Sequence, residues 1–420
     1  MKKLLFLLAF LLLPFSILAH IHEIISKNQR ILVSPSIAEN GKSLVYVGID
    51  CKTGRQAIFI SYLEENGTFS KPKIAVNTDC VIENIDKGFR YLQPNYVPFS
   101  AEEFRDQNGL DSPSVQDKII TFSATLIDSR RGVFYAIKRL NKWHVYPIAI
   151  QGQTMPIKDK SYYKSFNAPY ISARQKAIFL ATAENKLSYI FSYKIPDKLP
   201  KAEKPVMLVK ATEKICEFRD ISVDKANFAS IAKDENGILS VYTFDRHSGS
   251  FSQTAPDGNE LFKKMKNFRI KPEGVSYFAN KVAFSTCSID KDGKNVYAIY
   301  SNSGNNEFAI PVISSNEVIN SICVRLAKIW NPTLYTEDNT GYITFMGVLQ
   351  ENSRITGVYL ATLRNGKVNI DPIAVPGQRL ADGRMILAAT IGAVSIRHGI
   401  IPLALRLDNG DNVIAVARVN

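Results

Sequence analysis

The sequence predicts an all-β fold built from repeated antiparallel sheets, and three observations support this. A short apolar strand centred on one residue, usually aromatic, recurs about seven times, and a second such strand follows each copy 11 to 14 residues later. Turn-forming residues separate the paired strands, and no long segment has the 3.6-residue periodicity of a helix. Strand units that repeat every few tens of residues are typical of a β-propeller. We therefore predict a single propeller of seven four-stranded antiparallel blades.

Two copies of the strand pair are especially clear. Ile119–Phe122 precedes Gly132–Phe134, and Tyr342–Phe345 precedes Gly357–Tyr359. The first strands of all copies centre on Tyr46, Phe122, Phe179, Phe228, Phe284, Phe345 and Ala404, and the second strands on Phe59, Phe134, Phe191, Tyr242, Tyr297, Tyr359 and Ala415. Within a copy, the spacing fits two short strands joined by a hairpin.

The repeats divide the chain into units at about residues 30–80, 85–155, 160–212, 215–258, 262–314, 325–378 and 380–418. Hairpin turns are predicted at 234–237, 290–293 and 408–411, where Asp, Asn and Gly tolerate positive φ. We expect the strand Arg30–Ser34 to pair into the last unit and close the ring, which removes exposed sheet edges. The degenerate last unit leaves six or eight blades open as alternatives.

The first residues have the pattern of a bacterial secretory signal. Lys2 and Lys3 precede an apolar run from Leu4 to Leu13, and a cleavage site is predicted after Ala19. The run is too short for a comfortable transmembrane helix. A second apolar stretch, Met385–Leu405, contains charge, glycine and proline, which favours two buried strands. We therefore expect an exported chain, in the periplasm, at the cell surface or secreted, with residues 20–420 as one propeller domain and no transmembrane segment after cleavage.

The charge predicts partners of opposite sign. The formal net charge is +13, which favours an envelope protein or an anionic glycan or lipid surface. No basic run is interleaved with aromatic residues, so nucleic acid is not expected as a partner. The densest basic segment, Lys194–Lys204, contains prolines and is interpreted as a solvated loop. The sequence does not indicate an oligomeric state.

One insertion is acidic. It spans about residues 100–117 in the second unit and carries Glu102, Glu103, Asp106 and Asp111 as a candidate interaction loop. Two interpretations stay open for it, a mobile surface loop and a lid over a ligand.

Residues with catalytic or metal-binding chemistry are few. Asp290, Asp292 and Asn295 are weak candidates for calcium ligands, but Gly293 comes too early for a calcium loop, so a plain hairpin is the simpler reading. His398, next to Arg397, is interpreted as a hydrogen-bonded core histidine. Five cysteines show no metal-ligand spacing, and at most one disulfide is expected. There is no serine-nucleophile motif and no phosphate-binding glycine loop, so no catalytic residue and no cofactor are predicted.

The repeats resemble those of exported bacterial tandem-repeat proteins with an Asn-x-x-Gly-x-x-x-Ala-Phe type motif. Asn339–Phe345 and Asn280–Phe284 are similar to its first element, and Gly132–Phe134 and Gly357–Tyr359 to its Gly-Ile-Tyr strand. Ile148–Gln153 and Ile373–Gln378 look like the segment that follows. The resemblance implies an exported propeller-like protein of no established activity, and it transfers no site residue.

Two classes of function remain after this reading. The first is a non-enzymatic binding or scaffold protein, with its ligand over the central channel or the loop face. The alternative is a glycan-directed hydrolase or lyase with acidic residues in the channel. Two or three carboxylates, or a histidine with an arginine, converging at one channel mouth would favour the enzyme, whereas an apolar and amide lining would exclude it.

Overall fold

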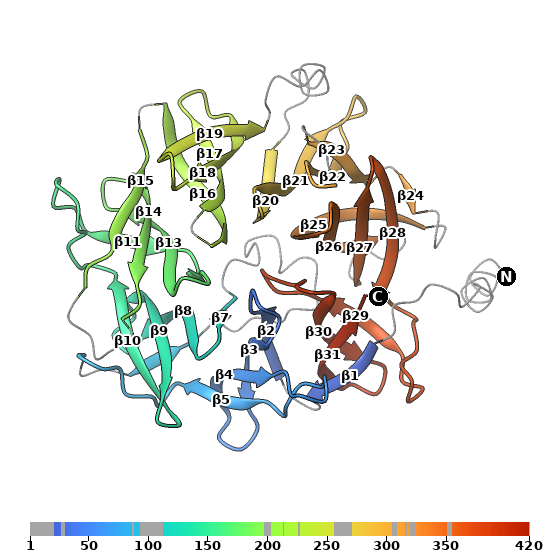
Figure 1. Cartoon of the computed structure of the whole chain (residues 1–420), viewed down its shortest axis with the longest axis horizontal. Coiled ribbons are helices and arrows are strands. Elements are labelled where there is room, and N and C mark those ends of the chain that lie inside the picture. Colours follow the sequence, from blue (N-terminus) through green and yellow to red (C-terminus); the bar gives the residue numbers. More distant parts are fainter. Residues whose placement is uncertain are drawn as a thin grey trace.

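The computed structural model describes residues 21–26, 30–85, 88–92, 112–196, 203–212, 214–225, 227–255, 271–304, 309–315, 317–319, 324–350 and 355–419. Within these ranges the chain is all-β, without a helix, and seven antiparallel sheets surround a central axis like the blades of a propeller (Figure 1). No helix in the described part is long and apolar enough to cross a membrane. The prediction of a seven-bladed β-propeller is confirmed.

The blades follow one another along the chain at the predicted units. Blade 1 consists of β2 (Arg30–Ile37), β3 (Ser43–Asp50), β4 (Arg55–Tyr62) and β5 (Lys73–Asn77). Blade 2 consists of β6 (Phe89–Tyr91), β7 (Ser114–Gln116), β8 (Ile119–Leu126), β9 (Arg131–Arg139) and β10 (Lys142–Ile150). Blade 3 consists of β11 (Tyr163–Phe166), β12 (Tyr170–Ile171), β13 (Lys176–Ala183), β14 (Ser188–Lys194) and β15 (Val206–Lys210). Blades 4 and 5 consist of β16 (Ile215–Asp224), β17 (Asn227–Asp234), β18 (Leu239–Asp245) and β19 (Ser250–Ala255); and β20 (Lys271–Phe278), β21 (Lys281–Ile289), β22 (Asn295–Ser301) and β23 (Ile310–Ser314). Blades 6 and 7 consist of β24 (Val318–Ile319), β25 (Val324–Glu337), β26 (Thr340–Leu349), β27 (Thr356–Arg364) and β28 (Lys367–Ala374); and β29 (Ile386–Thr390), β30 (Ile400–Leu407), β31 (Asn412–Arg418) and β1 (Ile21–Ser26).

Three blades carry one short extra strand, which does not change the four-stranded plan. In blades 2 and 3 the first strand is divided into two pieces, β6 with β7 and β11 with β12, and both pieces pair with the same neighbour. In blade 6 the short β24 pairs with the start of β25. The insertion predicted at about residues 100–117 includes β7 near its end, and its residues 100–111 lie outside the described residues.

The ring is closed by a different strand from the one predicted. Arg30–Ile37 is the first strand of blade 1, and it is β1 (Ile21–Ser26) that pairs with β31 in blade 7. The prediction of closure by the N-terminal region is therefore confirmed, but the assignment of Arg30–Ser34 is wrong. Both segments are short and apolar, and the pattern alone does not distinguish a closing strand from the opening strand of the next sheet.

The recurrent aromatics form stacked cross-strand pairs in six blades. Tyr46 faces Phe59, with ring centroids 5.2 Å apart, and Phe345 faces Tyr359 at 5.5 Å. The remaining pairs are Phe122 with Phe134, Phe179 with Phe191, Phe228 with Phe244, and Phe284 with Tyr300. Such pairs hold the second and third strands of each blade in register.

In three blades the residues predicted as the centres of the two strands lie in those strands but do not face one another. Phe228 pairs with Phe244 instead of Tyr242, and Phe284 pairs with Tyr300 instead of Tyr297. In blade 7, Ala404 faces Ile414, one residue away from the predicted Ala415. The register is set by hairpin geometry, and it brings a second aromatic opposite the first one in blades 4 and 5.

The predicted turns are confirmed. Gly237, Gly293 and Gly410 all have positive φ in hairpins that join the expected strands. The apolar stretch Met385–Leu405 forms β29 and most of β30 in the core of blade 7, as expected.

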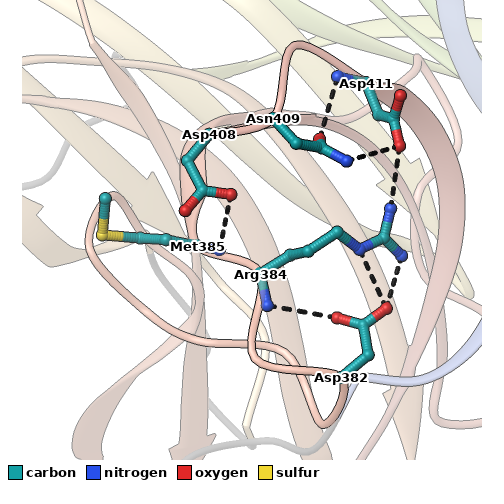
Figure 2. Close-up of polar contacts among 6 residues, drawn as sticks. All are labelled: Asp382, Arg384, Met385, Asp408, Asn409 and Asp411. Carbon is teal, nitrogen blue, oxygen red and sulfur yellow. Dashed lines mark hydrogen bonds and ion pairs between the residues drawn. The ribbon is translucent and has the colours of Figure 1, made fainter.

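A polar network fixes the edge of blade 7 (Figure 2). The Arg384 guanidinium lies 2.5 Å from an Asp382 carboxylate oxygen and 3.1 Å from an Asp411 oxygen. The backbone N–H of Met385 donates to Asp408 at 3.1 Å. These contacts join the loop before β29 to the β30–β31 hairpin. The carboxylates of Asp382 and Asp411 both form ion pairs with Arg384. We therefore interpret the network as structural.

Candidate functional site

The turns that follow the first strand of each blade meet at one mouth of the central channel. Side chains from these turns contact turns of other blades. Asn40 donates to Asp117 at 2.7 Å, and Glu39 accepts a hydrogen bond from the backbone N–H of Ala173 at 3.2 Å. Tyr335 and His398 are hydrogen-bonded at 3.1 Å. We call this end of the channel the turn mouth.

Blades 4 and 5 are joined there by side chains of β16. Asp220, Ser222 and Asp224 alternate along the strand, so all three point to one side. They accept hydrogen bonds from the backbone N–H groups of Val275, Tyr277 and Ala279 at 3.0, 3.0 and 2.8 Å, respectively. Side chains therefore replace backbone pairing between neighbouring blades. Asp224, at the end of β16, brings a buried carboxylate to the turn mouth.

A buried arginine faces two carboxylates at the mouth. Arg397 is 5% exposed, donates to the carbonyl oxygens of Leu334 and Ile396 at 3.1 and 2.7 Å, and stacks on Phe278. Burial lowers its pKa to about 10, although the carboxylates of Asp224 and Glu39 oppose this shift. Burial, followed by repulsion from Asp224, raises the pKa of Glu39. The three groups thus form one electrostatic unit across blades 1, 4 and 7.

Beside this unit lies a cavity of about 520 Å³ between blades 3, 4 and 5. Such a volume is within the range of about 300–1,000 Å³ that small-molecule sites occupy. Its lining contains Arg174, Lys225 and Arg246, all exposed and none within ion-pair distance of a carboxylate in the described ranges. The remaining lining residues are Asp224, Asn227, His247, Ala279 and Asn280. We call it the basic cavity.

Two asparagines of the basic cavity are held in fixed orientations. The Tyr277 hydroxyl donates to Asn280 Oδ1 at 2.7 Å, and Asn227 Oδ1 accepts the backbone N–H of Arg246 at 3.1 Å. The amide nitrogen of Asn227 contacts Asn280 Oδ1 at 3.4 Å and its side chain is hydrogen-bonded to Tyr277, so the amide nitrogen of Asn280 is the group left to serve a ligand. Lys225 and Ala279 adopt positive φ, which is uncommon for such residues and is concentrated at turns and functional sites. The site is therefore largely preformed.

The sequence candidates lie elsewhere. Asp290 accepts the backbone N–H groups of Asp292 and Lys294 at 2.9 and 2.8 Å, so this carboxylate supports its own hairpin, and Asn295 begins β22. No group of three or more metal-ligating side chains occurs in the described ranges. Glu102, Glu103, Asp106 and Asp111 lie outside the described residues.

The predictions for His398 and for the cysteines have different outcomes. The reading of His398 as a core histidine is wrong, because the side chain is exposed in a turn, although it does have the expected hydrogen bond, from Tyr335. His398 is exposed because it lies in the turn between β29 and β30. Cys51, Cys80, Cys216 and Cys287 are thiols, and Cys323 lies outside the described residues.

Arg174, Lys225 and Arg246 were missed by sequence reasoning. They come from three turns that lie far apart in the chain, so no local motif contains them. Lys225 directly follows the first strand of blade 4, and Arg174 lies in the corresponding turn of blade 3, three residues after β12. Alignment of the repeats by this turn position could have suggested a charged rim.

Burial raises the pKa of Asp220 to about 7, so the stability of the protein should depend on the ionisation of this carboxyl group. Between the unfolded pKa near 4 and that value, the folded protein binds a proton that the unfolded chain lacks, so stability falls as pH rises over this range. Asp220→Asn keeps an acceptor for Val275 and removes the charge. We expect it to raise the free energy of unfolding by about 2 kcal/mol at pH 8 and much less at pH 5.

Urea denaturation at pH 5, 6, 7 and 8 measures this difference. Asp290→Asn, in an exposed hairpin, removes the same formal charge and is the control, for which we expect nearly parallel curves. If Asp220→Asn also gives a curve parallel to that of the wild type, the ionisation of this buried carboxylate does not influence stability.

No family model and no curated protein matches the chain. Among solved structures it is similar to the BP39L lectin from Burkholderia pseudomallei, with 12% identity over 94% of this chain and 96% of that one and a TM-score of 0.44. It is also similar to the β-propeller domain of the Trilobed protease from Pyrococcus furiosus (13% identity, 73% and 83% coverage, TM-score 0.42) and to AofleA from Arthrobotrys oligospora (11%, 86% and 95%, 0.37). At these identities the similarity concerns the fold alone.

Proposed function

We propose that this chain is an exported, non-enzymatic binding protein of the bacterial periplasm or cell surface, and that the basic cavity is its ligand site. The observation that carries the proposal is the cavity of about 520 Å³, which is lined by three exposed cationic side chains and by a single carboxylate, that of Asp224. An excess of cations over carboxylates in one cavity favours an anionic occupant. The secretory signal at residues 1–19 supports export.

The groups that would perform chemistry at the mouth are largely occupied by the fold. One oxygen of Asp224 accepts from Ala279, and the Arg397 guanidinium is buried against two carbonyl groups. His398 is hydrogen-bonded to Tyr335. These contacts support binding over catalysis, because each group already has a structural role.

Calorimetric titration with glucuronate tests this proposal, with glucose as the neutral reference ligand. We expect wild type to bind the acid and not the neutral sugar, and Arg174→Gln/Arg246→Gln to lower the affinity at least about tenfold, since two charge-assisted contacts are lost. Arg364→Gln is the matched control, because Arg364 ends the third strand of blade 6 beside the corresponding hairpin. Equal affinity of the double variant and wild type would refute the assignment of the site.

A second function, glycan hydrolysis or elimination, is favoured by one observation. Two carboxylates, Glu39 and Asp224, do converge at a single channel mouth, and the pKa of Glu39 is raised by burial and by Asp224. Such enzymes use two neighbouring carboxyl groups, one as acid and one as base or nucleophile, and the acid has a raised pKa. Incubation of wild type and Glu39→Gln with polygalacturonate distinguishes the two functions, because release of chain ends by wild type alone would establish the enzyme.

A further inference from the structure

The cationic side chains continue beyond the basic cavity onto blade 3. Lys176, at the start of β13, lies directly opposite Lys194, at the end of β14. Arg174, which lines the cavity, precedes Lys176 by two residues. We call Lys176 and Lys194 the lysine pair. Together with the cavity residues they form a continuous basic track from the turn mouth outwards.

The members of the track repel one another. Burial lowers the pKa of Lys176, and the charges of Arg246, Arg174 and Lys194 lower it further. Like charges directly opposite on an antiparallel pair destabilise a sheet. The neighbouring Asp245 carboxylate is engaged by the backbone N–H of His247 and the hydroxyl of Ser248. The repulsion along the track is relieved when a ligand brings several negative charges along it.

The lining also restricts the class of polyanion. Apart from Ala279, every residue around the cavity is charged or polar, and none is Phe, Tyr or Trp. Bases of a single-stranded nucleic acid usually stack on several aromatic side chains in succession, whereas the lining of the cavity offers the one ring of His247. A lipid bilayer presents a broad surface, whereas these cations surround a hollow. Hydroxyl groups, in contrast, can use both the Asn280 amide and the cationic donors.

We propose that the ligand is an acidic polysaccharide, with one acidic sugar in the basic cavity and the next residues of the chain along the lysine pair. This inference rests on the proposed function, because it assigns the ligand class of the same site. The cavity supplies recognition of a single unit, and the lysine pair supplies affinity that depends on chain length.

The experiment compares calorimetric titrations with galacturonate and with its linear hexamer. We expect the hexamer to bind wild type at least about tenfold more tightly than the monomer, since additional charges engage additional cations. Lys176→Gln/Lys194→Gln should lower the hexamer affinity about threefold to tenfold and change the monomer affinity less than about twofold. Lys142→Gln/Lys367→Gln, in exposed hairpins of blades 2 and 6, is the matched control and should change neither.

The outcomes separate the two proposals. If the monomer and hexamer bind equally, or if the lysine pair has no effect while Arg174→Gln/Arg246→Gln abolishes binding, the polysaccharide inference is refuted and the anion site stands. If neither ligand binds wild type, the proposed function itself is refuted. Tighter binding of single-stranded DNA of equal charge, or of phosphatidylglycerol vesicles, would overturn the ligand class. The lysine variant should fold, because its substitutions remove repulsion.

Discussion

Phe345→Ala is expected to lower the free energy of unfolding by about 3–5 kcal/mol, the usual cost of removing a buried aromatic ring. Phe345 is fully buried in β26 and stacks on Tyr359 of β27 with a centroid distance of 5.5 Å and an interplanar angle of 19°. The substitution removes both the buried area and the stacking, and the backbone of a closed blade has little freedom to fill the space.

Urea denaturation followed by tryptophan fluorescence measures this effect. Phe345→Leu is the control, because it retains most of the apolar volume, and we expect a loss of no more than about 1.5 kcal/mol. A loss below about 1 kcal/mol for the alanine variant would mean that the stacked pairs are not the principal contacts between the second and third strands.

Arg397→Met is expected to lower the free energy of unfolding by about 2–4 kcal/mol at pH 7. Two buried carbonyl groups, of Leu334 and Ile396, lose their charged donor, and the contact with the Phe278 ring changes character. Glu39 also loses a cation that lowers its pKa. A higher pKa of Glu39 in the folded protein makes stability fall more steeply as pH rises above the unfolded value.

The loss caused by Arg397→Met should therefore be larger at pH 7 than at pH 5. Thermal and urea denaturation at the two pH values test this, with Arg397→Lys as the variant that keeps the charge and loses the fork of donors. We expect Arg397→Lys to show a smaller loss and less dependence on pH. An equal loss for both variants at both pH values would show that Arg397 acts through packing alone.

The fold could be predicted because its signal is local and repeated. Each hairpin has its own turn residues, such as Asp290 to Gly293, and the central strands of the blades are short apolar runs, as expected for strands buried on both faces. The prediction of the closing strand was wrong, because no local feature shows whether Ile21–Ser26 or Arg30–Ser34 pairs with the last strand, at the far end of the chain. Pairings over such distances leave no local pattern.

The candidate site could not be predicted for the same reason. Arg174 becomes a neighbour of Lys225 and Arg246 only when blades 3 and 4 pack side by side, and the buried Asp224 and Arg397 come from blades 4 and 7. The net charge of +13 predicts an anionic partner, but it does not show where on the molecule the charge gathers. The prolines of Lys194–Lys204 predict a solvated loop, but Lys194 is the last residue of β14 and faces Lys176, a pairing that only the strand register defines.

The central claim is that the basic cavity holds an anionic sugar, and a crystal structure of the protein grown with the galacturonate hexamer tests it most directly. We predict that a carboxylate group of the sugar lies within hydrogen-bonding distance of Arg174 and Arg246, with further units beside Lys176 and Lys194. A sugar bound at the opposite end of the channel, or on an outer blade edge with the basic cavity empty, would contradict the account.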